Sequence, residues 1–539
     1  MTATSCMRKS DCILILICIL FGTPAFGETH VGGTISGNVT WDPSGNPYIT
    51  DSSVTIAGGA TLTISPGVII RFSGAHALTV NGTLHAVGEE SNVITFTSDQ
   101  ASPGPGDWLY IYFNQTSTNS SLEYCLIEYG GYSNSSTIYC YQTSPIIRHN
   151  TIHQLSSTAI YVNWPAYPVI DDNTISNCGG TAIYLADQFN SNLQVTNNEI
   201  NGCNGYAIYG MAEFHNNSGT NNAVNGIKLP TPGAGAITGH LYGDNSLAYI
   251  GPFYVPGSGS ELTIDPGSVI KFDQNSWLTN GGTLNAQGTE SNPIVFTSLR
   301  DDTWAGDTNN DGNGSSPAAG DWLGMYLLLP SVSTNFDHCI IRYGGYGNNN
   351  MIYDDGGPLT IMNSEIGNCA WNGLYAVSTT NPIVIDGNLF HHCSATGIYY
   401  ENFTDTGLIR NNTFTNCAGY AIQGMAEFHN NSGSGNATNG IKLPSPSSGY
   451  SISGHLYGDN SMAFIGSVAV ASGHTLTIDA GVVMKFDDSN WSSFSGTLNI
   501  QGTGTNPVVL TSLRDDSWAG DTNNDGAGTT PSPGDWRGL

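Results

Sequence analysis

The hexapeptide DTNNDG occurs twice in the chain, at Asp307–Gly312 and at Asp521–Gly526. In a D-x-N-x-D-G segment, the side-chain oxygens at positions 1, 3 and 5 converge as the chain wraps, and glycine at position 6 permits the turn. Ca²⁺ prefers such oxygen ligands. The sequence therefore predicts a structural Ca²⁺ site in each loop, with the ligands Asp307, Asn309, Asp311, Asp521, Asn523 and Asp525.

These loops resemble the first half of the calcium loops of EF-hands and of dockerin-like or thrombospondin-type repeats. They depart from that pattern at position 12, where Ala318 or Ser532 replaces the expected bidentate Glu. The missing oxygens are expected from nearby acidic residues, namely Asp301 or Asp302 with Asp321 in one loop, and Asp515 or Asp516 with Asp535 in the other. The alternative is an ordinary polar turn, because Asp and Asn also populate turns without a metal.

A second pattern is a tyrosine that recurs about once per short repeat. If the neighbouring Ile and Leu face a core, alternation along a strand turns these rings outward. Aromatic rings beside Asn and Ser suit neutral sugars, which have apolar faces and polar edges. We predict a carbohydrate-binding column formed by Tyr139, Tyr161, Tyr184, Tyr209, Tyr353, Tyr375 and Tyr399. The alternative is that the stacked rings only protect the sheet.

Candidate catalytic groups are scattered along the chain. Carboxylates adjoin at Asp171–Asp172 and Asp354–Asp355, but neighbouring strand residues point to opposite faces, whereas glycoside hydrolysis needs two carboxylates across a groove. His391–His392 and the duplicated segment EFHNN, at Glu213–Asn217 and Glu427–Asn431, are further candidates. The arginines outside matching repeat positions are Arg148, Arg342, Arg410 and Arg537. The sequence favours a non-catalytic protein, with a polysaccharide lyase, hydrolase or epimerase as the alternative.

Internal repeats on two scales predict the elements that position these residues. GYAIYGMAEFHNNSG at Gly205 returns as GYAIQGMAEFHNNSG at Gly419, an offset of 214 residues. Within each copy, Asn150, Asn173 and Asn198 each precede an Ile by two residues, at spacings of 23 and 25. Such a short unit without an amphipathic helix cannot bury its apolar side alone, so it must stack on its neighbours. The sequence predicts an all-β solenoid with coils of about 23 residues, in tandem copies of 214 residues.

The coil corners carry Asn and Cys. Asn tolerates the left-handed backbone conformation of a sharp corner, and stacked amides can hydrogen-bond along the ladder. The cysteines recur once per coil, at Cys178, Cys203, Cys369, Cys393 and Cys417. One interpretation is a disulfide or metal column. Equivalent side chains on adjacent parallel strands suit disulfide torsions poorly, so we expect buried, reduced thiols that act as small apolar fillers.

Phrases such as NTIHQLSSTAIYV and NTISNCGGTAIYL resemble the coils of right-handed parallel β-helix proteins of the pectate-lyase-like superfamily. The resemblance covers most of the chain and is strongest over residues 122–210 and 336–424. It implies a right-handed parallel β-helix. Polysaccharide lyases and hydrolases share this fold, so the resemblance also keeps an enzymatic role open.

The N-terminus predicts export. Arg8 and Lys9 precede the apolar run Cys12–Phe21, and small residues at Ala25–Gly27 follow, which is the pattern of a secretory signal peptide over residues 1–27. The run is too short to span a bilayer, and no later segment is long and apolar enough for a transmembrane helix. A net charge of −29 disfavours nucleic acid and anionic membranes as partners. We therefore expect a secreted or cell-surface protein that binds carbohydrate or another surface partner.

The 214-residue period divides the chain into copies. The predicted divisions are copy 1 at residues 28–235, copy 2 at 236–449 with one calcium-type loop, and copy 3 at 450–539 with the second. PSPGDWRGL stops where the earlier copies enter a strand, so copy 3 is predicted to be cut short. The sequence leaves the glycan and the oligomeric state open.

Overall fold

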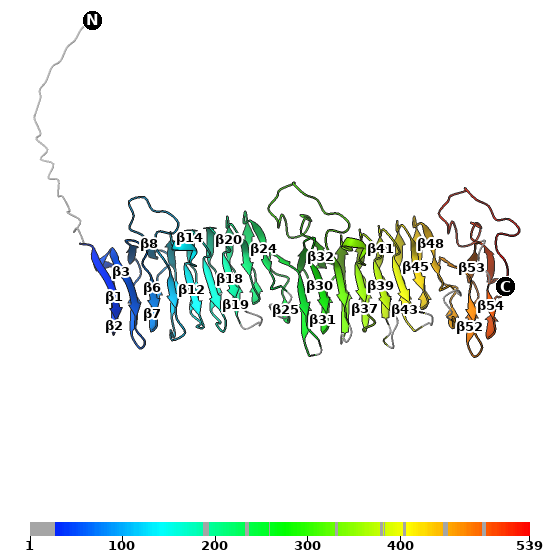
Figure 1. Ribbon diagram of the computed structural model, residues 1–539, viewed down its shortest axis with the longest axis horizontal. Helices are drawn as coiled ribbons and strands as arrows, with labels where there is room; N and C mark the ends of the chain where they lie inside the picture. Colours follow the sequence, from blue (N-terminus) through cyan, green and yellow to red (C-terminus); the bar gives the residue numbers. More distant parts are fainter. Residues whose placement is uncertain are drawn as a thin grey trace, which may run out of the picture.

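The chain winds into a rod in which each turn lies on the turn before it (Figure 1). This computed structural model describes residues 27–186, 193–231, 237–257, 259–328, 333–377, 381, 383–402, 406–445, 451–487 and 492–539. The predicted signal peptide, except for Gly27, lies outside the described residues. The rod is a right-handed parallel β-solenoid of about 19 turns of about 24 residues, which confirms the predicted fold class. Over the described ranges, no helix is long and apolar enough to cross a membrane.

Most turns contribute three short strands, one to each of three faces, and each strand pairs in parallel with its equivalents one turn away. The first face contains β2 (Asn38–Trp41), β4 (Thr61–Ile64), β7 (Thr83–Val87), β10 (Ser121–Glu123), β13 (Ile146–Arg148), β16 (Val169–Asp171), β19 (Gln194–Thr196) and β22 (Glu213–His215) in copy 1. It contains β25 (Gly239–Leu241), β28 (Glu261–Ile264), β31 (Thr283–Gln287), β34 (Ser333–Asp337), β37 (Leu359–Met362), β40 (Ile383–Asp386), β43 (Leu408–Arg410) and β46 (Glu427–His429) in copy 2, then β49 (Gly454–Leu456), β52 (Thr475–Ile478) and β55 (Thr497–Ile500).

The second face contains β5 (Ile69–Phe72), β8 (Ile94–Ser98), β11 (Cys125–Glu128), β14 (Thr151–Leu155), β17 (Thr174–Cys178), β20 (Glu199–Asn201) and β23 (Ser218–Thr220) in copy 1. It contains β26 (Ala248–Ile250), β29 (Val269–Phe272), β32 (Ile294–Ser298), β35 (Cys339–Arg342), β38 (Glu365–Gly367), β41 (Leu389–His391), β44 (Thr413–Thr415) and β47 (Ser432–Ser434) in copy 2, then β50 (Ala463–Ile465), β53 (Val483–Phe486) and β56 (Val509–Ser512).

The third face contains β6 (Leu78–Val80), β9 (Ile111–Phe113), β12 (Ile138–Tyr141), β15 (Ile160–Asn163), β18 (Ile183–Ala186), β21 (Tyr206–Tyr209) and β24 (Val224–Lys228) in copy 1. It contains β27 (Phe253–Val255), β30 (Trp277–Asn280), β33 (Gly324–Leu327), β36 (Ile352–Asp354), β39 (Leu374–Val377), β42 (Ile398–Glu401), β45 (Tyr420–Gly424) and β48 (Thr438–Lys442) in copy 2, then β51 (Ala469–Val470) and β54 (Ser493–Phe494). Strands β1 (Thr29–Ile35) and β3 (Tyr48–Ile56) span two faces, and single 3₁₀ turns occupy η1 (Pro43–Gly45), η2 (Tyr132–Asn134) and η3 (Tyr346–Asn348).

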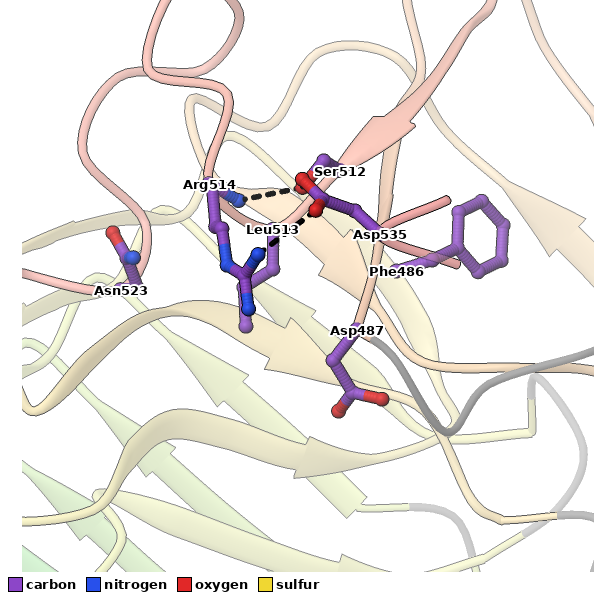
Figure 2. A pocket seen from close by; sticks show the side chains of 7 residues that line it. All are labelled: Phe486, Asp487, Ser512, Leu513, Arg514, Asn523 and Asp535. Atoms are coloured by element: carbon purple, nitrogen blue, oxygen red, sulfur yellow. Dashed lines mark hydrogen bonds and ion pairs between the residues drawn. The ribbon is translucent and has the colours of Figure 1, made fainter. Parts of the chain in front are cut away.

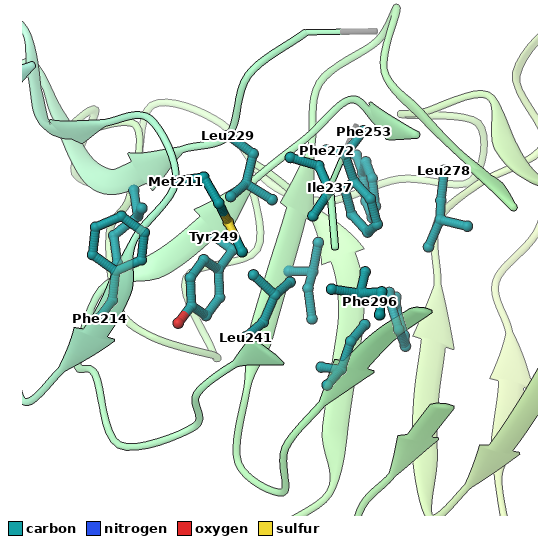
Figure 3. Close-up of a cluster of buried hydrophobic side chains, with 14 of the residues drawn as sticks. Met211, Phe214, Leu229, Ile237, Leu241, Tyr249, Phe253, Phe272, Leu278 and Phe296 are labelled. Carbon is teal, nitrogen blue, oxygen red and sulfur yellow. The ribbon is translucent and has the colours of Figure 1, made fainter. Parts of the chain in front are cut away.

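Alternation within each strand sorts residues between core and surface. In β18, Ile183 and Leu185 are buried, whereas Tyr184 between them is half-buried on the outer side. The buried apolar side chains form one cluster that runs from Trp41 to Phe486. Figure 3 shows this cluster at the junction of copies 1 and 2, where it continues from one copy into the next. The rod therefore has one continuous core.

Buried asparagines form a hydrogen-bonded ladder along one corner. In each step, the side-chain Nδ2 donates to Oδ1 of the Asn one turn further on, at 2.9–3.0 Å, and also to a backbone carbonyl of the preceding turn. The members in copy 1 are Asn150, Asn173, Asn198 and Asn217. This ladder confirms the predicted hydrogen bonding between corner amides, and it leaves these buried amide groups with partners.

The left-handed conformation falls one residue earlier than predicted. At this corner φ is positive at His149, Asp172 and Asn197, the residues immediately before the ladder asparagines. A second corner, at the end of the second-face strand β17, repeats the arrangement: Asn177 has a φ of +53° and directly precedes the buried Cys178. The left-handed residue makes the bend at each corner, so the next side chain can point into the core.

The cysteines are buried free thiols, as the sequence predicts. The described free cysteines are Cys125, Cys140, Cys178, Cys203, Cys339, Cys369, Cys393 and Cys417. Burial raises the pKa of the thiols of Cys125 and Cys140, which keeps them protonated. These residues pack as small apolar side chains and do not form a disulfide column in the described chain.

The faces change at the junctions between copies. Strand β21 pairs with β24, β24 with β26, and β26 with β29, so the third face of copy 1 continues into the second face of copy 2. The same change links copies 2 and 3 through β45, β48, β50 and β53. Equivalent faces of successive copies therefore do not line up along the rod.

One carboxyl group lies in the core. Asp354, in β36, is 1% exposed and stacks between the inward residues Leu327 and Ala376. Its Oδ1 accepts from the backbone N–H of Gly357 at 3.2 Å, while its Oδ2 is buried without a hydrogen-bond partner. Burial raises the pKa of Asp354 to about 7, because the charged form is poorly solvated there.

This buried carboxyl predicts a pH-dependent stability. The pKa of Asp354 is higher in the folded than in the unfolded state, so between pH 4 and 7 the folded state binds more protons and its stability falls as pH rises. A difference of about three pKa units corresponds to roughly 4 kcal/mol. We expect Asp354→Asn to remove most of this fall in urea unfolding measured at pH 4.5 and 7.5.

The neighbouring Asp355 provides the control, because it faces outward and its Oδ1 accepts from the Tyr353 hydroxyl at 3.4 Å. Asp355→Asn should leave the pH dependence unchanged. Equal pH slopes for wild type and Asp354→Asn would contradict the prediction.

Candidate functional site

The DTNNDG loop curls around Asp307. Its Oδ1 accepts from the backbone N–H of Asp311 at 3.1 Å, and its Oδ2 from that of Gly312 at 2.8 Å. One carboxylate oxygen from each of Asp302, Asp307 and Asp311 lies within 4.8 Å of the others. Oδ1 of Asp302 and Oδ1 of Asn309 are buried and have no hydrogen-bond partner. The second loop repeats this cluster with Asp516, Asp521 and Asp525.

Of the flanking acidic residues, Asp302 joins the cluster, while Asp301 and Asp321 bond elsewhere. Asp301 accepts hydrogen bonds from two threonine hydroxyls. Asp321 accepts from the Ser298 hydroxyl at 2.6 Å and from the Arg300 guanidinium at 2.8 Å. Burial and the charge of Asp307 raise the pKa of Asp302. The oxygens of Asp321, which the sequence predicted as additional ligands, are therefore already hydrogen-bonded within the protein.

A buried lysine lies under the cluster. Lys271 is fully buried, and its Nζ donates to the carbonyl of Gly306 at 2.8 Å. Burial lowers the pKa of Lys271 to about 8, against the opposing effect of the nearby carboxylates. Lys485 repeats the contact with the second loop. In copy 1, which lacks the loop, Arg71 occupies this position and lies 3.8 Å from Asp99 at the surface.

Each loop also binds the preceding copy. The backbone N–H of Asn225, in β24, donates to the carbonyl of Thr308 at 2.7 Å, and its Nδ2 donates to the carbonyl of Asp307 at 2.8 Å. Asn439, in β48, makes the same two bonds to the second loop. We call each set of bonds the inter-copy clamp. Sequence analysis missed it, because Asn225 and Asp307 lie 82 residues apart.

Cavities with mixed polar and apolar linings lie beside the loops. One of about 610 Å³ lies between the loop and the last turns of copy 1, lined partly by Asn225, Asn245 and Asp307. Another, shown in Figure 2, lies beside the second loop, where Arg514 pairs with Asp535 at 2.8 Å. A cavity with the equivalent residues lies beside the first loop. In the two cavities beside Arg300 and Arg514, the Ser, Arg and Asp side chains of the lining are already bonded to one another.

The predicted tyrosines form two stacked columns. In copy 1, successive ring centroids lie 4.5–5.2 Å apart, and the ring planes differ by at most 18°. This column consists of Tyr139, Tyr161, Tyr184 and Tyr209, and sequence analysis missed Tyr112 at its start. The column of copy 2 consists of Tyr353, Tyr375 and Tyr399, with the missed Tyr326 before them.

The stacking changes what these rings present to solvent. Turns of a parallel sheet are about 4.8 Å apart, so each ring covers the faces of its neighbours and leaves its edge and hydroxyl outward. Each column ends at a residue other than tyrosine: Tyr209 pairs with Lys228, and Tyr399 with Gln423. Because the faces change at the junction, the two tyrosine columns do not lie in line along the rod.

The candidate catalytic groups do not converge on one groove. Asp171 accepts from the hydroxyl of Thr196, while Asp172 lies 2.7 Å from His149. Asp354 and Asp355 point to opposite sides of their strand. Three arginines each pair with a carboxylate one turn away, at 2.6–2.8 Å: Arg148 with Glu123, Arg342 with Glu365 and Arg410 with Asp386.

The EFHNN segments pack at the junctions. His215 lies 2.8 Å from Asp244, and its ring contacts Tyr242 at a centroid distance of 4.0 Å. His429 makes the same contacts with Asp459 and Tyr457 in the second copy. The last Asn of each segment belongs to the asparagine ladder. These contacts favour a packing role for EFHNN at the junctions over a catalytic one.

His391 belongs to a polar cluster on the second face of copy 2. Its Nε2 lies 2.7 Å from Glu365, which also accepts two bonds from the Arg342 guanidinium, at 2.6 and 2.8 Å. Burial alone raises the pKa of Glu365, but the hydrogen bonds from His391 and Arg342 outweigh it and lower the pKa to about 2. Glu365 is therefore an ionised acceptor at neutral pH.

Comparisons with known proteins agree with this fold. The family model described as "Right handed beta helix region" matches residues 107–247 and 326–454, just over half of the chain. The "Pectate-lyase like beta helix domain" model matches residues 33–138. No curated protein matches the chain significantly.

Among solved structures, the periplasmic alginate epimerase AlgG is similar at 11% identity, over 88% of this chain and 85% of that chain, with a TM-score of 0.12. A TM-score this low carries no argument about activity. The family matches and the stacked parallel turns agree, and the chain therefore belongs to the right-handed β-helix family.

Proposed function

We propose that this protein is an exported, non-catalytic rod that binds extended carbohydrate along its tyrosine columns. The observation that carries the proposal is the regular spacing of one outward tyrosine per turn, with ring centroids 4.5–5.2 Å apart in copy 1. This spacing is comparable with the length of one sugar unit in an extended polysaccharide. A glycan chain lying along the column could therefore repeat the same contact at every turn.

The contacts would be made by ring edges and hydroxyls. Because stacking covers the ring faces within each column, hydroxyl groups and ring edges would meet the sugar; the hydroxyls of Tyr353 and Tyr375 already donate to Asp355 and Glu401, so they would act as acceptors. The formal charge of −29 favours a neutral glycan over an acidic one. Since the two columns lie in different strand columns of the rod, each copy would hold its own glycan strand.

We also propose that the two DTNNDG loops bind Ca²⁺ and stiffen the rod. Three carboxylates, from Asp302, Asp307 and Asp311, adjoin one buried ammonium, from Lys271. Their summed charge is −2 when Lys271 is protonated, and one divalent cation would balance it. Within this set Asp302 has an unpartnered oxygen, and the unpartnered Oδ1 of Asn309 is a suitable additional ligand. Cation binding would order the segment whose carbonyls form the inter-copy clamp.

The calcium proposal predicts a stability change. Saturating Ca²⁺ should raise the free energy of unfolding by about 2.7 kcal/mol per site at a hundredfold excess over Kd. Ca²⁺ should also protect both loops from proteolysis, measured by mass spectrometry of the fragments. Asp311→Asn should remove the protection of the first loop only, because the second loop keeps its own cluster.

The connection over residues 98–107 in copy 1 lacks the motif and provides an internal control, since its cleavage should not respond to Ca²⁺. Asn225→Ala should loosen the first loop without removing any cation ligand. Unchanged unfolding and cleavage in excess chelator would contradict the calcium proposal.

The carbohydrate proposal predicts the effect of removing two hydroxyls. Tyr161→Phe with Tyr184→Phe keeps the stacked rings but deletes their hydrogen-bonding groups. At about 1 kcal/mol for each hydrogen bond, retention on a gel of the bound neutral polysaccharide should weaken roughly tenfold or more. Affinity electrophoresis over a panel of neutral polysaccharides measures this retention for the variant and for wild type.

Thermal unfolding of the same variant tests whether the fold is intact, and it should match wild type within about 1 kcal/mol. Acidic polysaccharides in the panel provide a charge control. Wild-type retention of the doubly substituted protein on every neutral polysaccharide would contradict binding along the column.

A further inference from the structure

His391 and His392 break the repeat pattern at one corner of the rod. Position 392 is a left-handed corner residue with a φ of +50°, where the equivalent residues Asn177 and Asn416 have φ values of +53° and +56°. His391 lies in the ladder between Gly367 and Thr415. Two adjacent imidazoles thus replace neutral polar side chains at a single turn. His tolerates the left-handed conformation as Asn does, so the corner permits His392 but does not require it.

The two rings face each other through their Nδ1 atoms. Nδ1 of His391 lies 2.9 Å from Nδ1 of His392, and the ring planes are nearly perpendicular, at 86°. An ionised carboxylate only accepts hydrogen bonds, so Nε2 of His391 must donate its N–H to Glu365. In neutral His391, Nδ1 therefore carries the lone pair and accepts from the Nδ1–H of neutral His392; in the other tautomer of His392 the proton lies on Nε2, and both Nδ1 atoms carry lone pairs.

Glu365 holds the ring of His391 in place, and the lack of a side chain at Gly367 leaves room for it. The guanidinium of Arg342 holds both oxygens of Glu365, so the carboxylate cannot turn away. A side chain at position 367 would collide with the ring, since a Cβ there would lie 2.2 Å from Nε2 of His391. This pairing of a carboxylate with one imidazole nitrogen is the outer support that metal-binding histidines commonly have.

From this geometry we propose that His391 and His392 form a binding site for Cu²⁺ or Ni²⁺. A metal about 2.05 Å from two nitrogens that are 2.9 Å apart has an N–metal–N angle of about 90°. That angle suits neighbouring positions of a square-planar or octahedral ion, whereas tetrahedral Zn²⁺ needs a wider spacing. Water would supply the remaining ligands on the exposed side. The acidic surface favours cation approach.

Other histidines with described partners lack this arrangement. Each directs a ring nitrogen at a carboxylate, and in none of the contacts described for them does it face a second imidazole: His30, His149, His153, His215, His240, His338, His429 and His455. The paired imidazoles of His391 and His392 lie in one turn of copy 2. The proposed site is independent of the proposed Ca²⁺ loops, whose ligands are all oxygens.

The experiment compares the protein with the variant His391→Thr/His392→Asn. These residues occur at the same positions one turn further on, as Thr415 and Asn416, so the variant should fold normally. We expect calorimetric titration with Cu²⁺ to show one site in wild type that the variant lacks. Electron paramagnetic resonance of the bound Cu²⁺ should show two nitrogen ligands.

Two further measurements test the geometry. Ni²⁺ should bind at the same site, and Zn²⁺ should bind more weakly than Cu²⁺. Glu365→Gln should weaken Cu²⁺ binding by about 10- to 100-fold, because the carboxylate holds the ring. The same Cu²⁺ stoichiometry and affinity in wild type and in a folded double variant would overturn the proposal. Tighter binding of Zn²⁺ than of Cu²⁺ would overturn the assigned geometry.

Discussion

The buried asparagine ladder is the constraint on which the rest of the rod depends. Each ladder amide donates both to the next amide and to a backbone carbonyl of the turn before it, so the two contacts set the position of one turn over another. Burial makes the loss of either contact costly. The register fixed at this corner also sets the register of the strands on all three faces. A slip of one residue would exchange inward and outward side chains, so the alternative registers are unfavourable. The tyrosine columns follow from the same register.

The sequence predicted the features that repeat with the coil. Spacings of 23 and 25 residues between asparagines indicated the turn length, and alternation around Tyr184 indicated which side chains face the core. The buried thiols also followed from parallel stacking. The left-handed residue was placed one position late, since Asp172 and Asn173 are both suitable corner residues and only the backbone distinguishes them.

Features that depend on the junctions could not be predicted. Periodicity assigns strands to faces within a copy, but it does not show that the third face of copy 1 becomes the second face of copy 2. The stacking of ring faces was foreseen only as the alternative to sugar binding, although a 4.8 Å turn spacing implies it once the register is known. One feature of the sequence could have indicated a contact with the loop: Lys271 and Lys485 replace Arg71 only in the copies that carry a DTNNDG loop.

The loop itself is best understood from the hydrogen bonds that end at the junction. The backbone N–H of Cys203 donates to Oδ1 of Asn222, and Nδ2 of Asn222 donates to Oδ1 of Asn225. The N–H groups of Asn225 then need acceptors, and the carbonyls of the loop provide them. In copy 1, the equivalent connection joins β8 to β9. The turns before it begin with β1 and β3 and not with a junction, and this connection lacks the DTNNDG motif. The loop thus occurs where a series of buried amides would otherwise end without a partner, so its position is explained by the junction whether or not a cation binds there.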